Sequence, residues 1–83
     1  MDIGIEISLY PLTADYIPPI EDFIGRLNRE QRFKVVTNSM STQIFGPYEV
    51  LFAALTRELQ VTFERAGKAV FVMKVLGPYA TAS

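Results

Sequence analysis

The 83-residue chain contains no cysteine and no histidine, and these two absences exclude several kinds of chemistry. Without cysteine there is neither a disulfide framework nor a thiol nucleophile. Without histidine the chain lacks the commonest metal ligand and the commonest general acid–base, so a Ser–His hydrolytic pair is excluded. The sequence therefore predicts no catalytic residues, no metal site and no cofactor.

The chain also lacks a large excess of charge of one sign and has no long apolar run. The net charge is −1 and the charged residues are spread along the chain, so no basic patch supports binding to nucleic acid or to an anionic membrane. No apolar run approaches the length of a membrane span, and the N-terminus lacks the pattern of a signal peptide. We expect a cytoplasmic protein without nucleic-acid or membrane partners.

Apolar residues, by contrast, are abundant for so short a chain. They make up 49% of it, with six Phe and four Tyr among them. One small core cannot hide that much apolar surface, which predicts that the chain forms a homo-oligomer. We expect one domain over residues 1–79 and a disordered tail over residues 80–83.

Hydrophobic periodicity predicts the order strand, helix, strand, strand, helix, strand. The first strand, Ile3–Leu12, alternates apolar and polar residues, and the other strands are expected over Phe33–Asn38, Met40–Phe45 and Ala69–Leu76. The first helix has Pro18 and Pro19 in its first turn. Its expected apolar face is Ile17, Ile20, Phe23, Ile24 and Leu27, with Glu21, Asp22, Arg26, Arg29 and Glu30 turned to solvent. The second helix follows Gly46-Pro47 and ends near Ala66, with an expected buried stripe of Leu51, Phe52, Leu55, Leu59, Thr62, Phe63 and Ala66.

Right-handed connections turn this order into an α+β fold, the ferredoxin-like βαββαβ sandwich. Two helices cover one face of a four-stranded antiparallel sheet, in which the first and third strands are central neighbours. The other face stays bare within one chain. If Ile3, Ile5, Ile7 and Leu9 lie under the helices, then Glu6, Ser8 and Tyr10 lie on the bare face.

The third strand brings further polar groups to the same region. Met40, Thr42 and Ile44 share one of its faces, and Ser41, Gln43 and Phe45 share the other. Antiparallel pairing brings the 41–43 region near Ser8 and Tyr10. Hydroxyls, an amide, a carboxylate and a ring can bind a flat heterocycle, although ordinary solvated side chains would give the same pattern. A cross-strand Glu6–Lys74 pair likewise explains Glu6 without a ligand.

Three short segments occur in a distinctive order. They are Ile7-Ser-Leu-Tyr-Pro-Leu12, Asn38-Ser-Met-Ser-Thr-Gln-Ile-Phe-Gly46 and Val72-Met-Lys-Val75, with Glu49-Val50 in the intervening helix. In order and spacing they resemble the small YKOF-related thiamine/hydroxymethylpyrimidine-binding domains, over roughly residues 2 to 79.

The resemblance implies a ferredoxin-like domain that pairs with a second copy through the open sheet faces, as a homodimer or tetramer. It also implies that thiamine or its pyrimidine moiety binds at or near that interface. Ser8, Tyr10, Met40, Ser41 and Thr42 match the family's motifs. Glu6 is added from its place on the strand, and Gln43 and Phe45 stand where family members vary. Nothing in this set breaks a bond, so we expect a ligand-binding protein and not an enzyme.

Three other classes share the topology. An RNA-recognition domain needs central aromatic residues where this chain has Glu6 and Ser8. An acylphosphatase-like enzyme needs an arginine in the loop before the first helix, and residues 12–15 contain none. A self-assembling regulatory or structural module, whose open face binds only another subunit, remains the alternative function.

Overall fold

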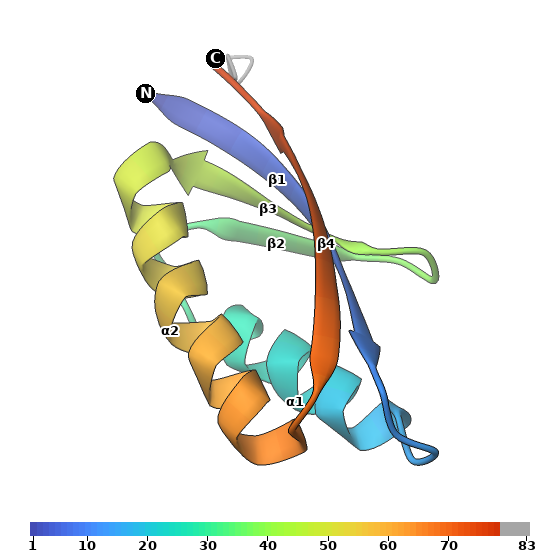
Figure 1. Cartoon of the computed structure of the whole chain (residues 1–83). Helices are drawn as coiled ribbons and strands as arrows, with labels where there is room; N and C mark the ends of the chain where they lie inside the picture. The colour runs from blue at the N-terminus through green and yellow to red at the C-terminus, as the bar shows by residue number, and fades with distance from the viewer. Residues whose placement is uncertain (79–83) are drawn as a thin grey trace.

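The structure, a computed structural model, describes residues 1–78 and contains six elements in the expected order (Figure 1). They are β1 (Asp2–Pro11), α1 (Ile17–Asn28), β2 (Lys34–Thr37), β3 (Thr42–Pro47), α2 (Tyr48–Ala66) and β4 (Ala69–Leu76). The sheet order is β2-β3-β1-β4, all antiparallel, and both helices lie on one face. The ferredoxin-like α+β fold is confirmed. The tail expected over residues 80–83, and Tyr79, lie outside the described residues.

The alternating residues of β1 form the centre of the core. Ile3, Ile5 and Ile7 are each at most 2% exposed, and Leu9 is buried beside them. They pack with residues of both helices and of the neighbouring strands, including Phe23, Leu27, Ile44, Leu51 and Leu55. The predicted orientation of β1 is therefore correct, and its even-numbered residues lie on the open face of the sheet.

The expected bounds of the third strand were wrong. β3 begins at Thr42 because the preceding residues form the turn of a hairpin. The side-chain Oδ1 of Asn38 accepts hydrogen bonds from the N–H groups of Met40 at 2.8 Å and Ser41 at 3.0 Å, and the N–H of Asn38 donates to the carbonyl of Ser41 at 3.1 Å. The structure also sets the orientation of β3, since Thr42 and Ile44 are buried under the helices.

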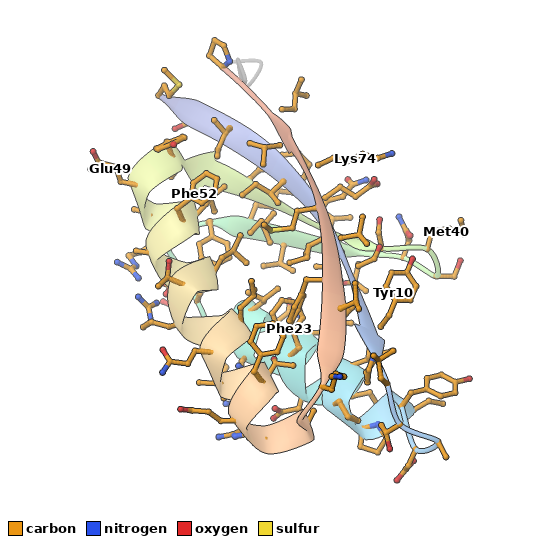
Figure 2. The ribbon with its side chains drawn as sticks, viewed as in Figure 1. Tyr10, Phe23, Met40, Glu49, Phe52 and Lys74 are labelled. Carbon is orange, nitrogen blue, oxygen red and sulfur yellow. The ribbon has the colours of Figure 1, made fainter. Side chains whose placement is uncertain are left out.

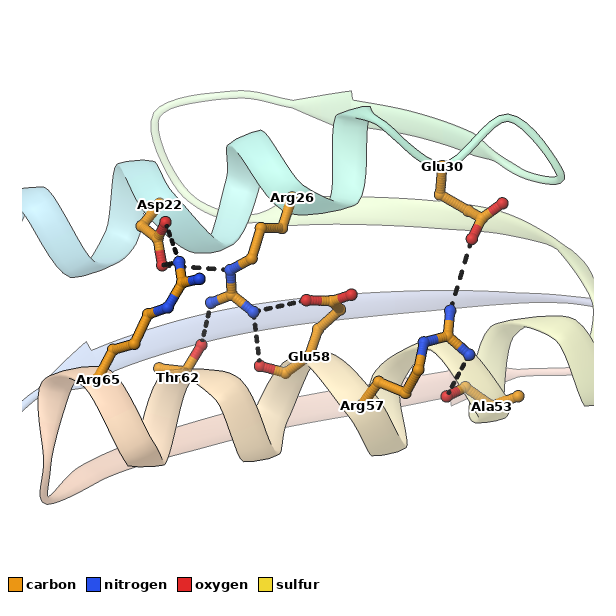
Figure 3. Close-up of polar contacts among 8 residues, drawn as sticks. All are labelled: Asp22, Arg26, Glu30, Ala53, Arg57, Glu58, Thr62 and Arg65. Atoms are coloured by element: carbon orange, nitrogen blue, oxygen red, sulfur yellow. Dashed lines mark hydrogen bonds and ion pairs between the residues drawn. The ribbon is translucent and has the colours of Figure 1, made fainter.

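Three expectations for the helices were also wrong. Ile17 was expected on the apolar face of α1, but it is 54% exposed. Arg26 was expected in solvent, but it is 9% exposed and lies between α1 and α2 (Figure 3). Phe63 was expected in the buried stripe of α2, but that face centres on Leu51, Leu55 and Thr62 with Ala54 also buried. Phe63 lies at its border, half exposed, with its ring edge-on to Phe71 at 5.5 Å between centroids.

α2 ends at Ala66, where the sequence predicted its end. Gly67 has a φ of 78°, which suits glycine, and its N–H donates to the carbonyl of Phe63 at 3.1 Å. The chain then enters β4 directly. Neither helix in residues 1–78 is long and apolar enough to cross a membrane.

Candidate functional site

A groove of about 440 Å³ opens at one end of the sheet, and we call it the edge groove. Residues 7–11 of β1 form one wall and residues 37–42 of the β2–β3 hairpin form another. Tyr16 and the first turns of α1 close the third side. The volume lies within the range of small-molecule binding sites.

The groove exists because β1 extends beyond its partner β3. The pairing of β1 with β3 ends at Ile7 and Thr42, whereas its pairing with β4 continues to Pro11 and Ala69. From Ser8 onward β1 therefore has a neighbouring strand on one side only. Figure 2 shows Met40 at the hairpin tip and Tyr10 on β1 at this same end of the molecule.

The edge groove is lined by apolar and aromatic side chains together with uncharged polar ones. Tyr10, Tyr16, Phe23, Ile20 and Ile24 contribute rings and aliphatic surface. The polar side chains come from Ser8 and from the hairpin residues Thr37, Asn38, Ser39, Ser41 and Thr42. Within residues 1–78, no charged side chain belongs to the lining, so the groove suits a flat and largely apolar ligand.

Several hydroxyls of this lining are available to a ligand. Within residues 1–78, the side chains of Ser8, Ser39, Tyr10 and Tyr16 make no hydrogen bond to protein. Thr42 differs, because its hydroxyl lies 3.3 Å from that of Thr37 and its side chain is buried. The free hydroxyls can each donate and accept one hydrogen bond from a bound heterocycle.

Five of the seven predicted site residues line the edge groove, and two do not. Ser8, Tyr10, Met40, Ser41 and Thr42 belong to it. Glu6 and Gln43 instead line a hollow of about 460 Å³ on the open sheet face, together with Phe45 and Lys74. The predicted cluster is therefore divided, with Ser41 at the boundary between its two parts.

Glu6 has protein partners on both sides. Its Oε2 accepts hydrogen bonds from Ser41 Oγ at 3.1 Å and Gln43 Nε2 at 3.4 Å. Its Oε1 lies 3.9 Å from Nζ of Lys74, directly across from it on β4. The Lys74 side chain is 83% exposed, so this ion pair contributes little to stability. The expected Glu6–Lys74 pair is confirmed, and the carboxylate orders the Ser41 wall of the groove.

Sequence reasoning missed the residues that α1 contributes. Tyr16, Ile20 and Ile24 were assigned to no site, although the fold brings the start of α1 beside the end of β1. A signal was present, since Tyr16 directly precedes a helix opened by prolines and is itself 53% exposed. A single exposed aromatic residue is common on a protein surface, so this signal alone would not have assigned Tyr16 to a site.

A smaller charged hollow of about 220 Å³ lies between the helices at the other end and is formed partly by Glu30 and Glu58. Three of its charged side chains, those of Arg26, Glu30 and Glu58, form ion pairs. Hydrogen bonds from the Arg32 side chain lower the pKa of Glu30 to about 2. Within residues 1–78, no group of three or more acidic side chains is placed to hold a metal ion.

A sequence profile described as the YKOF-related Family matches residues 2–74 of the chain. No significant match was found among curated protein sequences.

Solved structures share the fold at low sequence identity. Protein SP2199 from Streptococcus pneumoniae is 22% identical and superposes with a TM-score of 0.87, covering 95% of this chain and 89% of that one. A candidate thiamine biosynthesis/salvage protein from Thermotoga maritima is 14% identical, with a TM-score of 0.86 and coverages of 94% and 85%. A domain of unknown function, DUF77, from Bacillus cereus is 17% identical, with a TM-score of 0.81 and coverages of 100% and 82%.

Proposed function

The chain belongs to the YKOF-related family, and from that premise we propose that it is a non-catalytic binding protein for thiamine or its hydroxymethylpyrimidine moiety. The description of the Thermotoga maritima protein as a candidate in thiamine biosynthesis or salvage supports this ligand class. The edge groove is the proposed binding site, with Ser8, Tyr10, Met40, Ser41 and Thr42 on its walls.

The observation that carries the proposal is the uncharged, aromatic and hydroxyl-bearing lining of the groove. Thiamine joins a flat aminopyrimidine to a cationic thiazolium ring. The free hydroxyls suit the pyrimidine's nitrogen atoms, and the faces of Tyr10 and Tyr16 attract a cationic ring. The lining residues that the structure describes include no Lys or Arg to bind a phosphate, so the unphosphorylated forms fit the groove better.

The same lining supports a binding protein over an enzyme. The chain has no histidine and no cysteine, and among residues 1–78 neither a carboxylate nor an amine lines the groove. A hydroxyl has no neighbouring base there to activate it as a nucleophile. Glu6, the nearest predicted carboxylate, is held by Ser41, Gln43 and Lys74 outside the lining.

Filling the groove should abolish binding without unfolding the protein. Ile24 is half-buried and lines the groove, so Ile24→Trp places an indole in the ligand's space. We expect thiamine at about 100 times its Kd to stabilise the wild-type protein by about 2.7 kcal/mol in thermal unfolding. The variant should lose that stabilisation.

Gln60→Trp is the matched control, because Gln60 is exposed on α2, which contributes nothing to the groove. The control should respond to thiamine as the wild type does. Equal stabilisation of Ile24→Trp and the wild type would place the ligand elsewhere, and no stabilisation of any of the three would remove the proposed function.

We further propose that a second copy of the chain covers the open sheet face. Val70, Val72 and Leu76 of β4 and Tyr10 of β1 are exposed there, although apolar side chains of this size are usually buried. Glu6 and Lys74 lie side by side among them, so two copies related by a two-fold axis can match opposite charges.

The same exposed valines support the second candidate function. In a self-assembling regulatory or structural module, the open face would bind only another subunit and the edge groove would hold no small molecule. The two candidates agree on the interface and differ on the groove. Thiamine binding therefore separates them.

A further inference from the structure

The directions of the main-chain groups in β1 can be assigned from hydrogen bonds at its two ends. Successive residues of a strand point their N–H and C=O groups to opposite sides. The N–H of Leu12 donates to the carbonyl of Lys68 at 3.1 Å, so even-numbered residues point toward β4. The carbonyl of Met1 accepts from the N–H of Tyr48 at 2.9 Å, so odd-numbered residues point toward β3.

Within residues 1–78, this assignment leaves the N–H and C=O of Leu9 without a hydrogen-bond partner on the β3 side, although Leu9 lies opposite Phe71 of β4. Its N–H and C=O point to the β3 side, but the β1–β3 pairing ends two residues earlier, at Ile7. Met40 occupies the position that continues the register, and its N–H donates to Asn38 Oδ1 instead. Within residues 1–78 no hydrogen bond reaches Leu9 from this side, and Leu9 lines the edge groove.

The free edge is one residue long. Ile7 is paired with Thr42, and Pro11, the next residue that points the same way, has no N–H. An added β-strand needs several successive main-chain pairs, so this edge suits a small molecule better. Main-chain groups that face a groove need a partner, either water or a ligand.

We propose that the N–H and C=O of Leu9 anchor a planar heterocycle that carries an amino group next to a ring nitrogen. The ring nitrogen accepts from the Leu9 N–H and the amino group donates to the Leu9 carbonyl, as in 4-aminopyrimidines. This inference rests on the proposed function of the same groove. In this proposal the main chain of Leu9 determines the specificity for the ring, and the side chains of Ser8 and Tyr16 contact the ligand beside it.

The test is nuclear magnetic resonance of protein labelled with ¹⁵N-leucine, titrated with hydroxymethylpyrimidine and with its counterpart that lacks the 4-amino group. The Leu9 amide proton should move downfield on binding and exchange with solvent at least tenfold more slowly. The amide of Leu51, inside α2, serves as the control and should stay unchanged. The counterpart without the amino group should bind about tenfold more weakly, because one hydrogen bond is lost.

Ser8→Ala tests whether the 4-amino group of the ligand donates its hydrogen bond to a side chain and not to the main chain. The variant should keep the tenfold preference for hydroxymethylpyrimidine. Binding that leaves the Leu9 amide unmoved, or equal affinity for the two compounds, would overturn the anchor while the binding function stands. If neither compound binds, both the proposed binding function and the proposed Leu9 anchor are wrong.

Discussion

Replacing Arg26 by alanine is expected to lower the free energy of unfolding by about 3 kcal/mol, because it leaves the buried Thr62 and the partly buried Glu58 without their shared partner. The guanidinium donates to the Glu58 side chain at 2.6 Å and to the Glu58 carbonyl at 3.0 Å. It also donates to Thr62 at 2.6 Å and to Asp22 at 3.2 Å, so one side chain joins α1 to α2 (Figure 3).

Arg57→Ala is the matched control, since Arg57 forms an exposed pair with Glu30 at 3.6 Å. It should change the free energy of unfolding by less than about 0.5 kcal/mol. Urea unfolding of the wild type and both variants at neutral pH measures the difference. If the two variants lose equal stability, the Arg26 network is no stronger than a surface ion pair.

Introducing a carboxylate at Val72 is expected to dissociate the proposed dimer. Val72 lies on the open face beside Val70 and across from Ser8, and it is 50% exposed in the single chain. Val72→Glu would bury a charge, and its symmetry mate, in an apolar interface. We expect the wild type to sediment as a dimer or larger assembly and the variant as a monomer, with at least a 100-fold weaker association.

Thr56→Glu adds the same charge to the exposed face of α2 and should leave the association unchanged. Circular dichroism of Val72→Glu should show the native fold, because the valine side chain is half exposed in the single chain. Analytical ultracentrifugation over a range of concentrations makes the comparison. A monomeric wild type, or a variant that associates as strongly as the wild type, contradicts an interface on the open face.

The fold could be predicted because local patterns and topology agree. The alternation of Ile3, Ile5 and Ile7 in β1 gives one buried face, and its even-numbered residues are exposed or half-buried except Gly4. Gly67 marks the end of α2 because its positive φ is a conformation that glycine adopts readily, and a glycine can be recognised in the sequence. The whole of β4, Ala69–Leu76, was also predicted with its observed bounds.

Arg26 and the edge groove depend on information that local patterns lack. A helical wheel assigns a charged residue to solvent, yet Arg26 meets partners 32 and 36 residues later in the chain. The groove follows from the length of β1 relative to β3, which the Asn38 turn sets. Placing Ser8 and Ser41 together was possible from strand pairing, whereas separating Glu6 from the groove needed the three-dimensional structure.

Calorimetric titration with thiamine, hydroxymethylpyrimidine and thiamine diphosphate tests the proposed function most directly. We predict that thiamine or hydroxymethylpyrimidine binds with a micromolar or lower Kd, about −8 kcal/mol or better. Thiamine diphosphate should bind more weakly, because no Lys or Arg in the described part of the chain lines the edge groove. No heat, and no thermal stabilisation at millimolar ligand, would contradict the binding function and favour the self-assembling module.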